Sequence, residues 1–299
     1  MSGGESGMTA LLLLTTVVAA VRGLWSPCGL SMLSSLNPVA EAGRGQRFWI
    51  TALWYLAGAV AGGAVLGGAC ALGAWLVGSA GLPFGVRGTL ALAGAVAALA
   101  SDLRIGGWSL PDHPRQVDER WLTTYRRWIY AGGYGVQIGT GFATYVMTAG
   151  VYLLAALAVL SGRPGTALAA GGLFGLVRGA TIGLAALARD PGRLQSLMAR
   201  VDAAAGASAG VAVAAHVVVA AGMAALLGGP VAGVAVAAAL VLPVRAARRR
   251  ASSARLEPAP QPRTNSGRRG TSDPADRALP GPSARPAGQR SLGSTFTAT

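Results

Sequence analysis

The chain has 299 residues, of which 52% are hydrophobic and only 12% are charged, and its mean hydropathy is +0.49. Soluble globular domains carry about 25% charged residues, so this composition excludes an ordinary soluble enzyme. The net charge of +14 would suit a nucleic-acid-binding protein, but the basic residues lie in short loops and a tail rather than on one polar face. We therefore expect an integral membrane protein that is not a conventional enzyme and does not bind nucleic acid.

Long uncharged apolar segments recur along the chain and predict membrane-spanning helices, since about 20 apolar residues cross a bilayer. The first segment covers residues 8–36 and is predicted to break at Pro27, because proline removes a backbone donor. The other segments cover residues 48–78, 88–100, 131–160, 166–188, 205–227 and 231–244. The last two are separated by the turn sequence Gly228-Gly229-Pro230. The fold class expected is an all-α polytopic bundle of about seven helices, or six if those two segments form one interrupted helix.

The arginines between the segments predict how the chain is oriented. Alternate loops are rich in arginine. Of the three loops between them, one holds only Arg87, one holds only Arg163, and one holds no arginine. The arginine-rich regions contain Arg44 and Arg47; Arg104, Arg115, Arg120, Arg126 and Arg127; Arg189, Arg193 and Arg200; and Arg245 with Arg248 to Arg250. Because cytoplasmic loops carry the excess of basic residues, we expect a multi-pass protein of the cell membrane. Its N-terminus is predicted outside and its C-terminus in the cytoplasm.

The composition changes sharply after residue 245. Pro, Ser, Gly and Arg dominate residues 246–299, which have too few apolar side chains to form a core. The sequence thus predicts a transmembrane domain over residues 1–245 and a disordered cytoplasmic tail over residues 246–299. Arg245, Arg248, Arg249 and Arg250 are expected to contact anionic lipid headgroups, each for about 1 kcal/mol.

Few ionisable residues fall inside the predicted spans, and such residues are usually paired or functional. Arg178 has no acidic residue nearby in the sequence, so an anion or cavity role is weighed equally against snorkelling to the membrane surface or pairing with backbone carbonyls. Asp102 is interpreted as a helix-boundary residue, and His216 as a hydrogen-bonded interior histidine. His113, between two prolines, is interpreted as an ordinary loop residue. No metal or cofactor site is predicted.

The most distinctive motif is Ser26-Pro27-Cys28 in the first predicted helix. A proline before a cysteine at a helix break frees backbone groups and exposes one thiol to a cavity. Arg22 lies close enough in sequence to add a positive field, which favours the thiolate. Cys28 is therefore the candidate redox thiol, and Pro27 the candidate helix break.

This motif, in a small glycine-rich membrane protein, resembles the transmembrane family of DsbD and CcdA. The resemblance implies two inverted three-helix repeats, a role in cytochrome c biogenesis, and electron transfer by thiol–disulfide exchange from cytoplasmic thioredoxin to extracytoplasmic partners, so thioredoxin-like proteins are candidate partners. It places one redox cysteine at Cys28. The position expected for the second cysteine holds Val146, and a relay needs two thiols; Cys70 is the only other cysteine.

Three functions are therefore considered from the sequence. The first is a DsbD/CcdA-like membrane protein without the full two-cysteine relay. The second is a small-solute or anion exporter or permease, in which Arg22 and Arg178 line the substrate path. The third is a non-catalytic membrane scaffold that binds partners through its tail.

Overall fold

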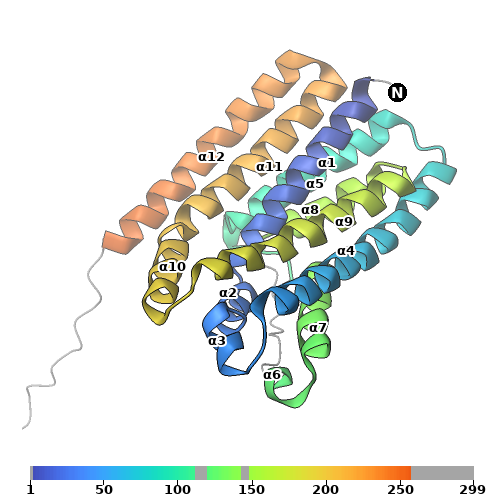
Figure 1. Ribbon diagram of the computed structural model, residues 1–299. Coiled ribbons are helices and arrows are strands. Elements are labelled where there is room, and N and C mark those ends of the chain that lie inside the picture. The colour runs from blue at the N-terminus through green and yellow to red at the C-terminus, as the bar shows by residue number, and fades with distance from the viewer. Residues whose placement is uncertain (1–2, 112–119, 143–147, 257–299) are drawn as a thin grey trace, which may run out of the picture. The chain divides into compact units, whose positions relative to one another are not determined.

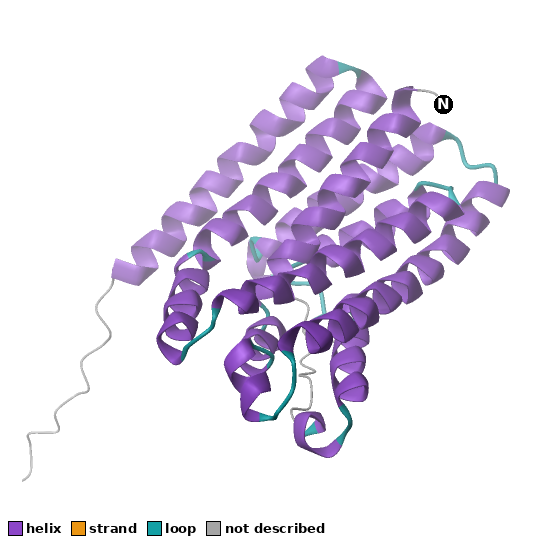
Figure 2. Ribbon diagram, viewed as in Figure 1, coloured by secondary structure: helices purple, strands orange, loops and turns teal. Residues whose placement is uncertain are grey.

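A computed structural model describes residues 3–111, 120–142 and 148–256, and the side chains of residues 243 and 246–256 are not among those described. Within these ranges every regular element is a helix (Figure 1, Figure 2). The elements up to the first gap are α1 Gly3–Arg22, η1 Gly23–Trp25, α2 Pro27–Ser35, α3 Pro38–Gly43, α4 Phe48–Ser79, α5 Phe84–Asp102 and η2 Ile105–Gly107. Those that follow are α6 Trp121–Thr124, α7 Arg127–Thr140, α8 Gly150–Leu160, α9 Pro164–Ala180, η3 Thr181–Leu187, α10 Pro191–Ala203, α11 Ala205–Gly228 and α12 Pro230–Leu256.

The all-α class is confirmed. Five helices are long and apolar enough to cross a membrane: Gly3–Trp25, Phe48–Ser79, Phe84–Asp102, Pro164–Leu187 and Ala205–Gly228. Two shorter apolar helices, Gly150–Leu160 and Pro230–Leu242, bring the described apolar segments to the expected seven. The domain boundary predicted after residue 245 stays a prediction, because α12 continues to Leu256 and residues 257–299 lie outside the described part.

The predicted single span over residues 131–160 is wrong. It is divided between α7 and α8, and α7 ends at Gly141, whose φ of 75° no other residue type adopts easily. Hydropathy missed this boundary because both flanks are apolar. Val146 and His113 lie outside the described residues.

The break predicted in the first apolar segment is present. α1 ends at Arg22, a single 3-10 turn follows, and α2 starts at Pro27. The Ser26 hydroxyl caps α2 by accepting a hydrogen bond from the Gly29 amide at 3.0 Å. Pro27 fits at the first helical position, where its missing N–H costs nothing. The chain therefore changes direction here through ordinary helix-capping chemistry.

Helix α4 is packed backbone to backbone against two other helices. A side-chain carbon added at Gly58 would lie 2.1 Å from the Gly132 carbonyl oxygen of α7. One added at Gly63 would lie 2.3 Å from the Gly171 oxygen and 2.8 Å from Gly175 of α9. Such glycine contacts let membrane helices approach closely, and they fix α7 and α9 on neighbouring faces of α4.

Two apolar clusters result from this packing. The larger one joins α1, α4, α5, α8, α9 and α11, and buries Leu12 and Phe174 completely. The smaller one lies where α2, α7, η3 and α10 meet the start of α4, and it contains Cys28 and Tyr134.

Replacing Gly63 by Leu is expected to prevent assembly of the bundle. Overpacking costs about 1–3 kcal/mol where neighbours can shift, and here the neighbour is backbone. The matched control is Gly68→Leu in the same helix, where nothing lies within 4 Å of the added carbon. Size-exclusion chromatography of detergent-solubilised membranes measures the monodisperse fraction. Equal fractions for the two variants would contradict this packing.

Candidate functional site

The most unusual residue inside the bundle is Arg178, near the end of α9. Its side chain is only 4% exposed, and its guanidinium lies directly on Gly23, at the break after α1. A carbon added at Gly23 would lie 2.0 Å from the Arg178 Nη1 atom. A side chain at this position would have to displace the Arg178 guanidinium from its place.

Arg178 has few partners for a buried charge. Its Nε and Nη2 atoms have no hydrogen-bond partner, and among the described residues no carboxylate lies within ion-pair distance of it. The Phe174 ring is 5.7 Å from the guanidinium carbon, and Tyr55 and Cys28 lie close enough to interact with it electrostatically. Burying a charge without compensation costs several kcal/mol. The fold keeps this arginine at a cost to its stability.

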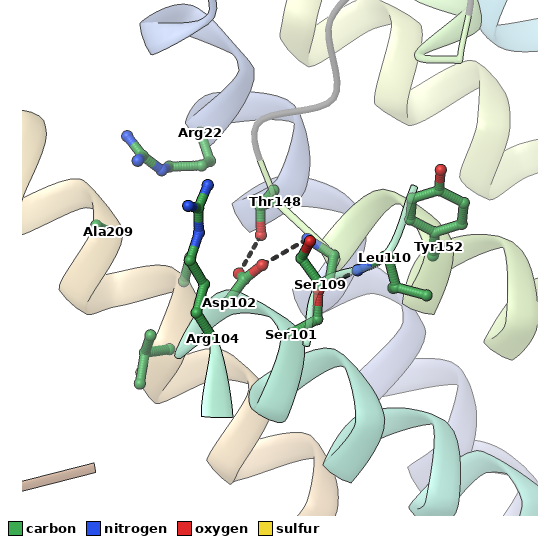
Figure 3. Close-up of a pocket in the computed structure, with 12 residues that line it drawn as sticks. Arg22, Ser101, Asp102, Arg104, Ser109, Leu110, Thr148, Tyr152 and Ala209 are labelled. Atoms are coloured by element: carbon green, nitrogen blue, oxygen red, sulfur yellow. Dashed lines mark hydrogen bonds between the residues drawn. The ribbon is translucent and has the colours of Figure 1, made fainter. Parts of the chain in front are cut away.

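A polar cavity of about 130 Å³ lies between the ends of α1, α5, α8 and α11 (Figure 3). A water molecule takes about 30 Å³ of liquid volume, so a few waters or one small ion fit inside. Asp102 lines the cavity at the end of α5. Its carboxylate accepts hydrogen bonds from the Thr148 hydroxyl at 2.5 Å and the Ala149 amide at 2.7 Å.

His216 approaches the same carboxylate from α11. Its Nδ1 atom is 3.8 Å from the Asp102 Oδ2 atom, and the ring is buried. The ring is interior, as expected from the sequence, and it also interacts with the backbone of Ala212. Asp102 is also more than a boundary residue, because it joins α5, α8 and the chain before α8 in one polar group.

Two arginines complete the cavity wall. Arg22, the last residue of α1, donates a hydrogen bond to the Ser208 hydroxyl of α11 at 2.8 Å. Arg104 extends toward Arg22 beside Asp102 (Figure 3). Its φ of 50° is the only positive φ at a described non-glycine residue, and such backbone strain clusters at functional sites. The sequence census missed Arg104 because it follows a span rather than lying inside one.

A second polar group, in a loop, was also missed. Glu41 of α3 is fully buried, pairs with Arg44, and accepts a hydrogen bond from the Thr51 hydroxyl. The Tyr130 hydroxyl donates to it at 3.2 Å, and burial together with the Glu41 charge raises the pKa of Tyr130. Every acceptor oxygen of Glu41 thus has a partner. This group ties α3 to α4 and α7, which is a structural role.

The candidate redox thiol lies apart from the cavity. Cys28 is completely buried in the smaller apolar cluster, and Cys70 belongs to the larger one. Neither forms a disulfide. Pro27 is the first residue of α2, as the predicted break requires.

The curated relatives of this chain are methylamine utilization proteins. No family model and no solved structure matches it. It is 32% identical to methylamine utilization protein MauF of Paracoccus versutus over 200 residues, which is 66% of this chain and 72% of the relative. It is 31% identical to MauF of Paracoccus denitrificans, over 67% of this chain and 72% of the relative.

The predicted relationship to DsbD and CcdA is wrong, and cytochrome c biogenesis and thiol–disulfide electron transfer fall with it. The structure supplies the physical reason. Ser26 and Pro27 are a cap and a first-turn proline, a combination that starts helices of any function, and Cys28 fills an apolar cluster. The expectation of thioredoxin-like partners and of inverted repeats rested on the same resemblance. The name of these relatives mentions neither an exporter nor a scaffold.

The chain belongs to the MauF family of methylamine utilization proteins.

Proposed function

We propose that this chain is an integral protein of the cell membrane that serves methylamine utilization by binding an anionic group at the arginine site around Gly23. The site consists of Arg22 and Arg104 at the cavity and Arg178 beneath the break. Membership of the MauF family of methylamine utilization proteins supports the proposed role in methylamine utilization. The proposed anion-binding site is supported above all by the buried charge of Arg178, which has no carboxylate partner among the described residues.

The charge balance of the site decides which class of ligand it favours. The guanidinium groups of Arg22 and Arg104 line the cavity with one carboxylate, Asp102, which already accepts two hydrogen bonds. Methylamine is protonated near neutral pH, so a surplus of positive charge repels it. Guanidinium groups recognise carboxylate and phosphate groups. The proposed role in methylamine utilization is therefore exerted on an anionic group rather than on methylammonium itself.

A strain lacking this chain is expected to lose growth on methylamine while still taking up labelled methylamine. The wild-type chain restores growth, and the double variant Arg22→Gln, Arg104→Gln does not, although it reaches the membrane in equal amount. Arg189→Gln, an exposed control, restores growth fully. Normal growth of the deletion strain on methylamine would refute the role in methylamine utilization. Full rescue by the double variant would refute only the anion-binding site.

Replacing Arg178 by Met is expected to raise stability and abolish growth on methylamine. Substituting apolar residues of similar volume for buried charges is often stabilising, by about 1–4 kcal/mol, so thermal unfolding in detergent should move upward by several degrees. Arg189→Met is the exposed control. A loss of about 3–5 kcal/mol would instead show that Arg178 has a structural partner, and the anion role would be untenable.

The orientation belongs to the same proposal: an outside N-terminus, a cytoplasmic C-terminus, and Arg245 with Arg248 to Arg250 near anionic headgroups. Fusing alkaline phosphatase after Gly81, between α4 and α5, should give an active enzyme, and fusing it after Thr299 an inactive one. Green fluorescent protein should show the reverse, since it fluoresces only in the cytoplasm. The opposite pattern would invert the proposed topology.

A further inference from the structure

We propose that the groove between α4 and α7 binds one anionic phospholipid, with an acyl chain along the groove and the headgroup phosphate at Arg47, Arg126 and Arg127. This site lies apart from the cavity around Asp102. It stands whether or not the proposed role in methylamine utilization is correct.

The groove is apolar and has a volume of about 450 Å³, within the range of small-molecule sites in proteins. Its walls are aromatic: the rings of Trp54 and Trp128 are 6.4 Å apart, and Trp121 lies at the same groove. Trp54 and Trp128 are 46% and 54% exposed. Large aromatic side chains that stay half exposed around an apolar groove present a surface for an apolar chain.

Small residues keep the groove open. Ala57 and Ala61 of α4 and Gly132 and Gly133 of α7 line it, and none has a side chain beyond one carbon. The contact of Gly58 with the Gly132 carbonyl holds the two backbones together, so the helices cannot rotate their larger side chains inward. The groove is therefore a fixed consequence of the glycine contact.

The two helices run in the same direction. Gly58 of α4 contacts Gly132 of α7. One turn further along α4, Gly62 contacts the carbonyl of Val136, which is likewise one turn further along α7. Because the helices are parallel, both N-terminal ends lie toward one end of the groove. Figure 1 shows both helices starting in the lower part of the bundle. Arg47 precedes α4, Arg126 precedes α7, and Arg127 is the first residue of α7.

This placement joins a positive end to an apolar groove. In the described part of the chain, no carboxylate lies within 4.0 Å of these three guanidinium groups. Basic pockets beside membrane helices bind anionic headgroups, and tryptophans gather at the level of the headgroups. An anionic phospholipid matches this arrangement, because its phosphate can contact the three arginines while its acyl chain fills the apolar groove. An apolar partner helix would fill the groove and leave the three arginines without a counter-charge.

Quenching of tryptophan fluorescence by brominated acyl chains tests the site. The full chain is reconstituted in phosphatidylcholine vesicles that contain a small mole fraction of either dibrominated phosphatidylglycerol or dibrominated phosphatidylcholine. We expect saturable quenching by the anionic lipid with an apparent affinity several-fold higher than that of the neutral lipid. High salt should reduce the difference, because headgroup attraction is screened. Equal quenching by the two lipids would overturn the proposal.

Two pairs of variants separate the headgroup from the groove. Arg126→Gln with Arg127→Gln should remove the preference for the anionic lipid, while Arg163→Gln with Arg189→Gln should keep it. Ala57→Leu with Ala61→Leu fills the groove from exposed positions and should abolish saturation, whereas Ala64→Leu with Ala69→Leu, exposed on the same helix, should not.

An unchanged preference in either test pair would overturn the lipid site. A wild-type dimer that Ala57→Leu with Ala61→Leu dissociates, with lipid preference unaltered, would assign the groove to a second copy of the chain instead. All four double variants change exposed or half-exposed side chains, so folding should be retained; size-exclusion chromatography checks this.

Discussion

Helix α4 approaches α7 and α9 backbone to backbone through glycine, and the rest of the structure depends on this contact. Where a side-chain carbon would lie 2.1–2.3 Å from a neighbouring carbonyl oxygen, the helices have no freedom to separate or rotate without losing the contact. This contact places the end of α9, and with it Arg178, at the level of the break after α1. It also leaves the groove beside Gly58 and Gly132 open. The charged site and the proposed lipid site therefore depend on the same packing constraint.

The break after α1 connects the two parts of the charged site. Helix α1 ends there, so Arg22 can turn toward the cavity and α11, while Gly23 accommodates the Arg178 guanidinium. A larger residue at position 23 would compete with the Arg178 guanidinium for this space. A buried charge without a partner lowers stability, and proteins accept such costs at functional sites. This is why the geometry favours a ligand role over a packing role for Arg178.

Much of the fold could be predicted from hydropathy, because long charge-free segments have few alternatives to a membrane-spanning helix. The break at Pro27 was also predictable from proline chemistry. The division between α7 and α8 was not, since Gly141 acts through its backbone conformation inside an apolar run. The cavity was missed because Ser101, Arg104 and Thr148 are ordinary residues that only the tertiary structure brings together. Arg178 was singled out from the sequence as a charge in a span without an acidic neighbour, and its burial came only from the structure. The motif around Cys28 suggested the wrong family because helix caps recur in unrelated proteins.

The most direct test of the central packing claim is an experimental structure of the chain in lipid nanodiscs, read at the crossing of α4 and α9. We predict that the backbones of Gly63 and Gly175 are in van der Waals contact and that the Arg178 guanidinium lies on Gly23. An ordinary separation of about 8–10 Å between the helix axes, with side chains between them and Arg178 facing lipid or water, would contradict the account.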